Sequence, residues 1–205
     1  MNLPNKLTML RVILIPFFIF FLLTDMMGDT GAWIALAIFC VASFTDFLDG
    51  QIARRCNLVT NFGKFMDPLA DKLLVCSALI CFVEMGLLPS WFVIVIIARE
   101  FIISGFRLVA SDAGVVIAAS FWGKFKTVSQ MFTIILFITM EGLGKVMYWD
   151  GLTLNEVMSP ECSADLSALS IAGTVLAWLS FALTVISLID YIAKNKDVMK
   201  DKKEK

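Results

Sequence analysis

Six long apolar runs, separated by shorter polar connectors, most strongly constrain what this chain can fold into. Each run is close to the roughly 20 residues that a helix needs to cross the hydrocarbon core of a bilayer. The 205 residues are 59% hydrophobic with a mean hydropathy of +0.85, which lies outside the range of soluble domains. The sequence therefore predicts an all-α polytopic membrane protein with six transmembrane helices. The expected spans are Leu7–Leu23, Ala32–Ile52, Asp67–Val83, Trp91–Val109, Lys126–Glu141 and Leu166–Ile192.

The chain shows no internal repeat and no change of composition that would mark a second domain. Residues 1–205 are therefore expected to form a single transmembrane domain, with a charged tail from about residue 194. The first apolar run is too long for a cleavable signal peptide and lacks an evident cleavage site. Five cysteines without paired spacing favour neither a disulfide framework nor a zinc site. The absence of histidine excludes His-dependent catalytic triads and zinc-protease motifs.

The basic residues fall on one side of the six expected spans. Apart from Lys145, every lysine and arginine belongs to the half of the membrane that also holds the two termini. Because cytoplasmic segments are enriched in Lys and Arg, this bias predicts that both termini are cytoplasmic. The net charge of −1 and the lack of a basic tract interleaved with aromatics give no indication of a nucleic-acid partner.

Two pairs of aspartates flank the connector between the second and third expected spans. Asp46 and Asp49 are three residues apart and Asp67 and Asp71 are four apart, spacings at which side chains share one face of a helix. Each acid alone could cap a helix or lie in a hydrated loop. Four carboxylates that converge stay ionised only when cations neutralise them, and Mg²⁺ or Mn²⁺ suit oxygen ligands. The pattern therefore predicts a divalent-metal site.

Small residues are interleaved with these acids. Gly50 and Ala53 follow Asp49, and Gly63 precedes Asp67 by one turn. Without bulky side chains at these positions, a flat or extended ligand can approach the backbone closely. Pro68 is expected either to open the following helix or to kink it.

The complete pattern from Asp46 to Asp71 is D-x2-D-G-x2-A-R-x8-G-x3-D-x3-D, and it resembles the signature of the CDP-alcohol phosphotransferases at every position. The resemblance implies that the four aspartates hold two divalent ions, Mg²⁺ or Mn²⁺, which bind the pyrophosphate of a CDP-linked lipid. It also implies a homodimer and a role for Asp71 as general base, and a carboxylate base agrees with the absence of histidine. The residues implied for the CDP-lipid site are Asn5, Thr8, Gly50, Ala53, Arg54 and Gly63.

A second group of charges lies in the fourth and fifth expected spans. Arg99 and Glu100 sit well inside the fourth span, where a mutual ion pair or a snorkelling arginine is the simplest interpretation. Arg107 follows about two turns later, and Lys124 and Lys126 come from the next span. Such a cluster suits a phosphate group, whose oxygens match the planar guanidinium. For the two lysines alone, a position at the membrane surface is the alternative.

Three segments, 5–11, 98–100 and 123–127, together with Arg107, resemble the branch of the same family that makes phosphatidylglycerol phosphate. The resemblance covers about residues 2–140. It implies CDP-diacylglycerol as donor and sn-glycerol 3-phosphate as acceptor. The expected location is the inner membrane of a bacterium, and the lysine and arginine bias places the four aspartates, and so the active site, on the cytoplasmic side. The acceptor phosphate would be bound by Arg99, Arg107, Lys124 and Lys126.

Other functions fit parts of the pattern. The same chemistry could use inositol phosphate, serine or a phospholipid as acceptor, although the basic residues disfavour serine. Prenyltransferases also carry acidic motifs, but on two distant helices rather than around one connector. A divalent-cation transporter would need polar groups through the full depth of the membrane, and the outer halves of these spans hold few.

Overall fold

The computed structural model describes residues 3–24, 27–56, 61–112, 120–144 and 164–194, and within these ranges the chain forms six long α-helices. Each helix contains one of the six apolar runs, so the predicted all-α class is confirmed. The helices are α1 (Leu3–Leu23), α2 (Asp29–Cys56), α3 (Asn61–Glu84), α4 (Ser90–Asp112), α5 (Phe121–Gly142) and α7 (Ala164–Lys194).

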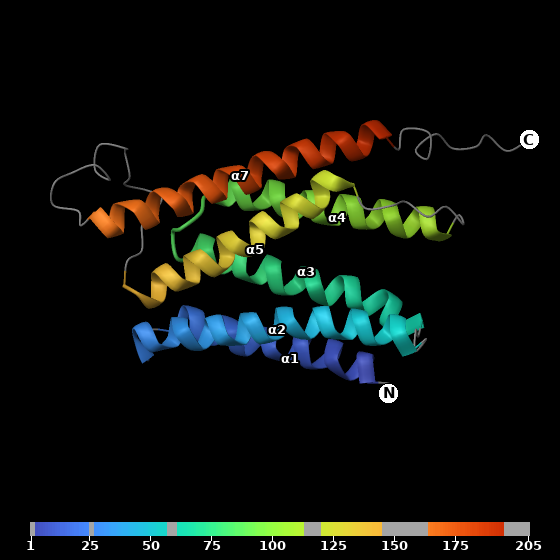
Figure 1. The fold of residues 1–205 in the computed structure, drawn as a ribbon, viewed down its shortest axis with the longest axis horizontal. Coiled ribbons are helices and arrows are strands. Elements are labelled where there is room, and N and C mark those ends of the chain that lie inside the picture. Colours follow the sequence, from blue (N-terminus) through green and yellow to red (C-terminus); the bar gives the residue numbers. More distant parts are fainter. Residues whose placement is uncertain (1–2, 25–26, 57–60, 113–119, 145–163, 195–205) are drawn as a thin grey trace, which may run out of the picture.

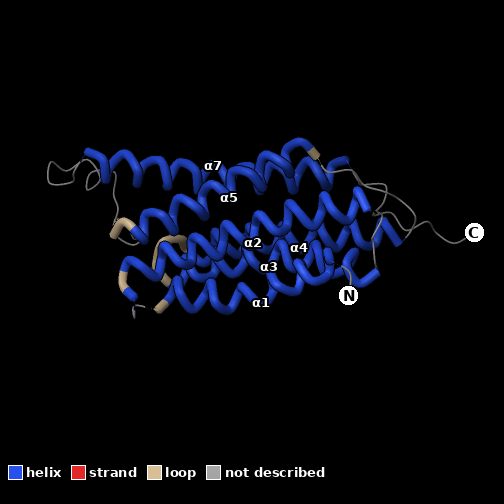
Figure 2. The backbone as a smooth tube through the Cα atoms, turned by 60° about the horizontal axis from the view of Figure 1, so that its bottom comes forward, coloured by secondary structure: helices blue, strands red, loops and turns tan. Residues whose placement is uncertain are grey.

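The helices run alternately in opposite directions along the long axis of the molecule (Figure 1). At one end of the bundle α1, α3 and α5 begin and α2, α4 and α7 end. A second view shows the same elongated bundle with the described turns at its ends (Figure 2). The helix ends that flank the aspartate motif and the basic segments therefore lie at the same end of the molecule.

Apolar side chains hold neighbouring helices together along the length of the bundle. Helix α1 packs on α2 and α3, α5 packs on α2 and α7, and α4 packs on α3 and α7. Phe18 and Phe39 join α1 to α2 with ring centroids 5.8 Å apart, and Phe92 stacks on Phe181 between α4 and α7 at 4.7 Å. Aromatic pairs at these separations contribute about 0.5–1.5 kcal/mol beyond their burial.

Two glycines have a structural role in the bundle, one at a close helix contact and one in a tight turn. A Cβ at Gly31 would lie 2.8 Å from the backbone oxygen of Phe21, so α1 and the start of α2 meet almost backbone to backbone. Gly86 ends α3 with a φ of 71°, a left-handed conformation that glycine adopts without strain. The resulting tight turn leads directly into α4, which therefore runs back alongside α3.

Two helices in the described part of the chain contain segments that are long and apolar enough to cross a membrane, Lys6–Leu23 and Ile171–Lys194. The apolar part of α2, Asp29–Thr45, is shorter. Helix α4 interrupts its apolar sequence with Arg99 and Glu100. Large apolar side chains are exposed all around the bundle, as expected for a surface that faces lipid. That all six helices span the membrane stays a prediction.

The helix boundaries extend beyond the apolar runs. Helix α3 begins at Asn61 rather than near Asp67, so Pro68 lies inside the helix instead of opening it. Helix α5 begins at Phe121 rather than at Lys126. Its cap is Ser120, whose hydroxyl accepts a hydrogen bond from the Gly123 backbone N–H at 3.1 Å. This earlier start places the two lysines of the basic cluster within the first two turns of α5.

Candidate active site

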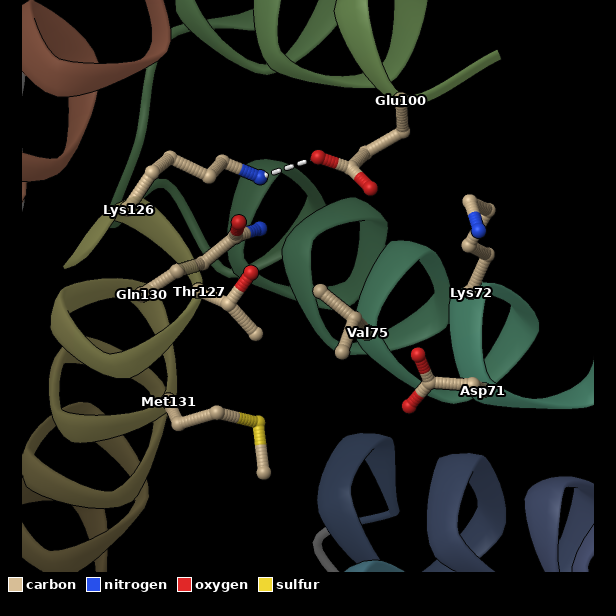
Figure 3. Close-up of a pocket in the computed structure, with 8 residues that line it drawn as sticks. All are labelled: Asp71, Lys72, Val75, Glu100, Lys126, Thr127, Gln130 and Met131. Atoms are coloured by element: carbon tan, nitrogen blue, oxygen red, sulfur yellow. Dashed lines mark hydrogen bonds and ion pairs between the residues drawn. The ribbon is translucent and has the colours of Figure 1, made fainter. Parts of the chain in front are cut away.

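A cleft with a volume of about 180 Å³ opens between α3, α4 and α5. This volume suits a small polar molecule and is too small for a whole lipid. Asp71 and Lys126, which the sequence assigned to the metal site and to the acceptor phosphate, line the same cleft (Figure 3). The lining residues are Asp71, Lys72 and Val75 from α3, Glu100 from α4, and Lys126, Thr127, Gln130 and Met131 from α5.

Glu100 bridges two buried cations at one wall of this cleft. Its Oε1 accepts hydrogen bonds from Arg99 Nη1 at 2.8 Å and from Lys126 Nζ at 2.5 Å. Arg99 is 6% exposed and Lys126 is 1% exposed, so neither cation is compensated mainly by water. The three residues together carry one net positive charge, and we refer to them as the Glu100 triad.

The Glu100 triad is anchored to two further elements of the fold. Arg99 Nε donates a hydrogen bond to the buried hydroxyl of Ser187 on α7 at 3.0 Å. Arg99 Nη2 lies against the first turn of α5, because a Cβ at Gly123 would be 3.3 Å from it. The start of a helix is positively polarised and favours anions. The Arg99 guanidinium and the start of α5 therefore produce a region of positive electrostatic potential beside the cleft.

The structure brings together only part of the predicted basic cluster. Arg99 and Lys126 meet through Glu100, so the ion-pair interpretation of Arg99 and Glu100 describes a contact that is present. Arg107 and Lys124 are exposed on α4 and α5. A phosphate bound by all four cations would therefore have to lie between the buried pair, Arg99 and Lys126, and the exposed pair, Arg107 and Lys124.

The predicted metal and donor site lies on described backbone, but most of its side chains lie outside the described set. Helix α2 is helical through positions 46 and 49, and α3 through 67 and 71, so the backbone has the spacing that the prediction requires. Asp71 is exposed on α3 and Thr8 is fully buried in α1. Among the described side chains, no group of three or more His, Cys, Asp or Glu gathers. The predicted residues whose side chains lie outside the described set are Asn5, Asp46, Asp49, Gly50, Ala53, Arg54, Gly63 and Asp67.

Three residues at this site were not assigned a role from the sequence. Lys72 follows Asp71, and Gln130 lies one turn after Lys126, so helical spacing could have placed both at the cleft. Ser187 gave no such signal, because its contact with Arg99 depends on how α7 packs against α4.

Residues 1–186 match the sequence pattern of the protein family described as CDP-alcohol phosphatidyltransferase. The chain belongs to this family. This membership confirms that the protein is a CDP-alcohol phosphatidyltransferase, the enzyme class that the aspartate motif predicted. The matched residues include all the cleft residues and most of α7.

Bacterial proteins are similar to this CDP-alcohol phosphatidyltransferase over nearly its full length. A CDP-diacylglycerol–glycerol-3-phosphate 3-phosphatidyltransferase of Bacillus subtilis is 40% identical over 97% of each chain. A protein of the same name from Haemophilus influenzae is 35% identical over 98% of this chain and 96% of its own. A probable phosphatidylglycerophosphate synthase of Mycobacterium tuberculosis is 36% identical over 94% of this chain and 81% of its own.

Proposed function

We propose that this protein is a phosphatidylglycerophosphate synthase, which transfers the phosphatidyl group of CDP-diacylglycerol to sn-glycerol 3-phosphate and releases CMP. The observation that carries the proposal is the similarity, at 35–40% identity over almost the whole chain, to relatives named for this reaction. The cleft supports it, because an acid and two buried cations line or adjoin one space of suitable size for a small phosphorylated acceptor.

The acceptor phosphate is proposed to bind to Arg99 and Lys126, with Arg107 and Lys124 at the entrance. Glu100 takes one hydrogen bond from each buried cation, so Lys126 keeps further N–H donors and Arg99 keeps Nη2. The net positive charge of the Glu100 triad and the start of α5 both favour a dianion. Arginine and lysine bonds to phosphate are charge-assisted, and each contributes about 1.5–3 kcal/mol.

The donor site is proposed to be the aspartate motif. Asp46, Asp49, Asp67 and Asp71 would hold two Mg²⁺ or Mn²⁺ ions, which when bound supply the positive charge that neutralises the pyrophosphate and the departing CMP. Carboxylate oxygens are the ligands that these ions prefer, and the two helices that carry the acids meet at one end of the bundle. The remaining residues proposed for the CDP-lipid are Asn5, Thr8, Gly50, Ala53, Arg54 and Gly63.

Asp71 is proposed as the general base. Its carboxylate takes the proton of the acceptor's primary hydroxyl while that oxygen forms a bond to the phosphorus of the phosphatidyl group. The bond between this phosphorus and the oxygen of CMP breaks in the same displacement. The exposed position of Asp71 at the cleft supports this role, because the acceptor enters from water.

The six helices are proposed to cross the inner membrane of a bacterium as a single domain, residues 1–205, with both termini and the active site cytoplasmic. The alternating helix directions and the lysine and arginine bias support this topology. In a cysteine-free background, a cysteine at position 57 should react only from the cytoplasm and one at position 155 only from outside. Labelling of both from the same face would contradict the topology. The homodimer also stays a prediction.

An acceptor-exchange assay tests the reaction itself. The purified protein in lipid nanodiscs receives CDP-diacylglycerol and Mg²⁺ with one water-soluble acceptor at a time, and CMP release is measured. Glycerol 3-phosphate should support release, whereas serine and inositol phosphate should not. CMP release with another acceptor and none with glycerol 3-phosphate would overturn the assignment.

A further inference from the structure

Gln130 is a buried polar residue that the proposed reaction does not yet use. It lies on α5, one turn after Lys126, and is only 3% exposed. Its Nε2 is buried, and among the residues that the structure describes no hydrogen-bond partner reaches it. Buried amide donors are normally paired, because a donor removed from water without a partner is unfavourable. The amide of Gln130 is therefore available to a group from outside the described protein.

That group would have to arrive through the cleft. Figure 3 shows the Gln130 amide extending from α5 toward α3, beside the Lys126–Glu100 pair. The neighbouring hydroxyl of Thr127 donates to the backbone oxygen of Gly123 at 3.0 Å, so it is already engaged in its own helix. Gln130 thus provides an uncharged donor at this wall of the cleft.

The proposed reaction leaves one hydroxyl of the acceptor without a protein partner. The phosphate of glycerol 3-phosphate lies toward the buried cations, and its primary hydroxyl lies toward Asp71. The secondary hydroxyl, on the carbon between them, must then lie between these two ends of the cleft. Gln130 lines the cleft beside Lys126, on the path from the buried cations toward Asp71, and Val75 and Met131, which also line it, provide apolar contacts for the carbon chain.

We infer that the Gln130 amide binds the secondary hydroxyl of the acceptor and makes the enzyme selective for a polyol phosphate. This inference rests on the proposed function and adds a specificity residue to it. Sites built to hydrogen-bond a substrate hydroxyl reject analogues that lack it, because the protein group is then left unpaired. The enzyme should therefore discriminate against an acceptor that differs from glycerol 3-phosphate only in this hydroxyl.

The test compares glycerol 3-phosphate with 3-hydroxypropyl phosphate, which has the same primary hydroxyl and phosphate but no secondary hydroxyl. The wild-type enzyme should prefer glycerol 3-phosphate by about 10–100-fold in kcat/KM. Gln130→Met keeps the length of the side chain and removes the amide. It should reduce the preference to about threefold or less, through lost activity with glycerol 3-phosphate.

The control is Met131→Leu, which alters an apolar residue of the same cleft and should leave the preference unchanged. A Gln130→Met enzyme that keeps the wild-type preference, with both activities reduced equally, would show a purely structural role and overturn the inference. Equal use of the two acceptors by the wild-type enzyme would overturn it even if the variant fails to fold. No activity of the wild type with glycerol 3-phosphate would instead refute the proposed function.

Discussion

Replacing Glu100 by glutamine should destabilise the helix bundle strongly. The substitution removes the negative charge that bridges Arg99 and Lys126, whose side chains are 8% and 2% exposed. Both cations would stay buried beside each other without a counter-charge. Breaking a buried ion pair by removing one partner costs about 3–5 kcal/mol. Because the amide oxygen of glutamine can still accept hydrogen bonds from the cations although it carries no charge, we expect a loss at the lower end of this range, about 3 kcal/mol in the free energy of unfolding.

A double-mutant cycle measures how much of this loss comes from the contact with Lys126. The free energies of unfolding of Glu100→Gln, Lys126→Met and the double variant are obtained by denaturant titration in mixed micelles. The double variant holds only one buried cation, so its loss should be smaller than the sum of the two single losses. The expected coupling is about 1–3 kcal/mol.

Lys124 provides the matched control, because it lies on the same helix but is exposed. Combining Lys124→Met with Glu100→Gln should give additive losses within about 0.5 kcal/mol. A coupling below this value for Lys126 as well would mean that the Glu100 triad does not stabilise the packing of α4 against α5.

Three further substitutions test separate parts of the molecule. Gly31→Ala should lower the free energy of unfolding by about 1–3 kcal/mol, because the new Cβ would meet the Phe21 backbone oxygen at 2.8 Å. The control Gly105→Ala, whose Cβ would have nothing within 4 Å, should not lower it. Equal effects of the two substitutions would refute the close approach. Asp71→Asn should reduce CMP release by at least about 100-fold in protein that still unfolds cooperatively, and near-normal turnover would exclude Asp71 as the base. Arg107→Ala should lower kcat/KM for glycerol 3-phosphate about tenfold, the effect of one lost charge-assisted bond, and leave KM for the CDP-lipid unchanged. A change confined to the CDP-lipid would place Arg107 on the donor side.

The helices could be predicted from the sequence because each one contains a single long apolar run. Their ends were less accurate, since apolarity reports the part that contacts lipid or core, whereas backbone hydrogen bonding continues into polar sequence. Helix α3 thus extends back to Asn61 through a segment whose apolar residues are interrupted by Gly63 and Lys64. The Ser120 cap shows why α5 starts before Lys126, and a serine directly before a helix is a capping signal that the sequence itself contains.

The cleft was predictable only in part for a related reason. Residue type and helical spacing indicated that Asp71, Arg99 and Lys126 were functional candidates. Spacing relates residues within one helix, so it could not show that Glu100 would bridge to a lysine on another helix or that Ser187 would reach Arg99. Nor does polarity alone tell whether a glutamine such as Gln130 faces a neighbouring helix, lipid or a cleft.

The contact between Arg99 and Glu100 also has a consequence for the biogenesis of the protein. A single charged residue in the middle of a helix opposes membrane insertion by about 2.5–3.5 kcal/mol on translocon scales. Here two opposite charges are adjacent in α4 and pair at 2.8 Å, so they can enter the bilayer as a neutral unit. Lys126 lies on α5 and meets a counter-charge only when α5 packs against Glu100 of α4. We therefore expect α4 to be able to insert first, and α5 to enter lipid against α4 rather than alone.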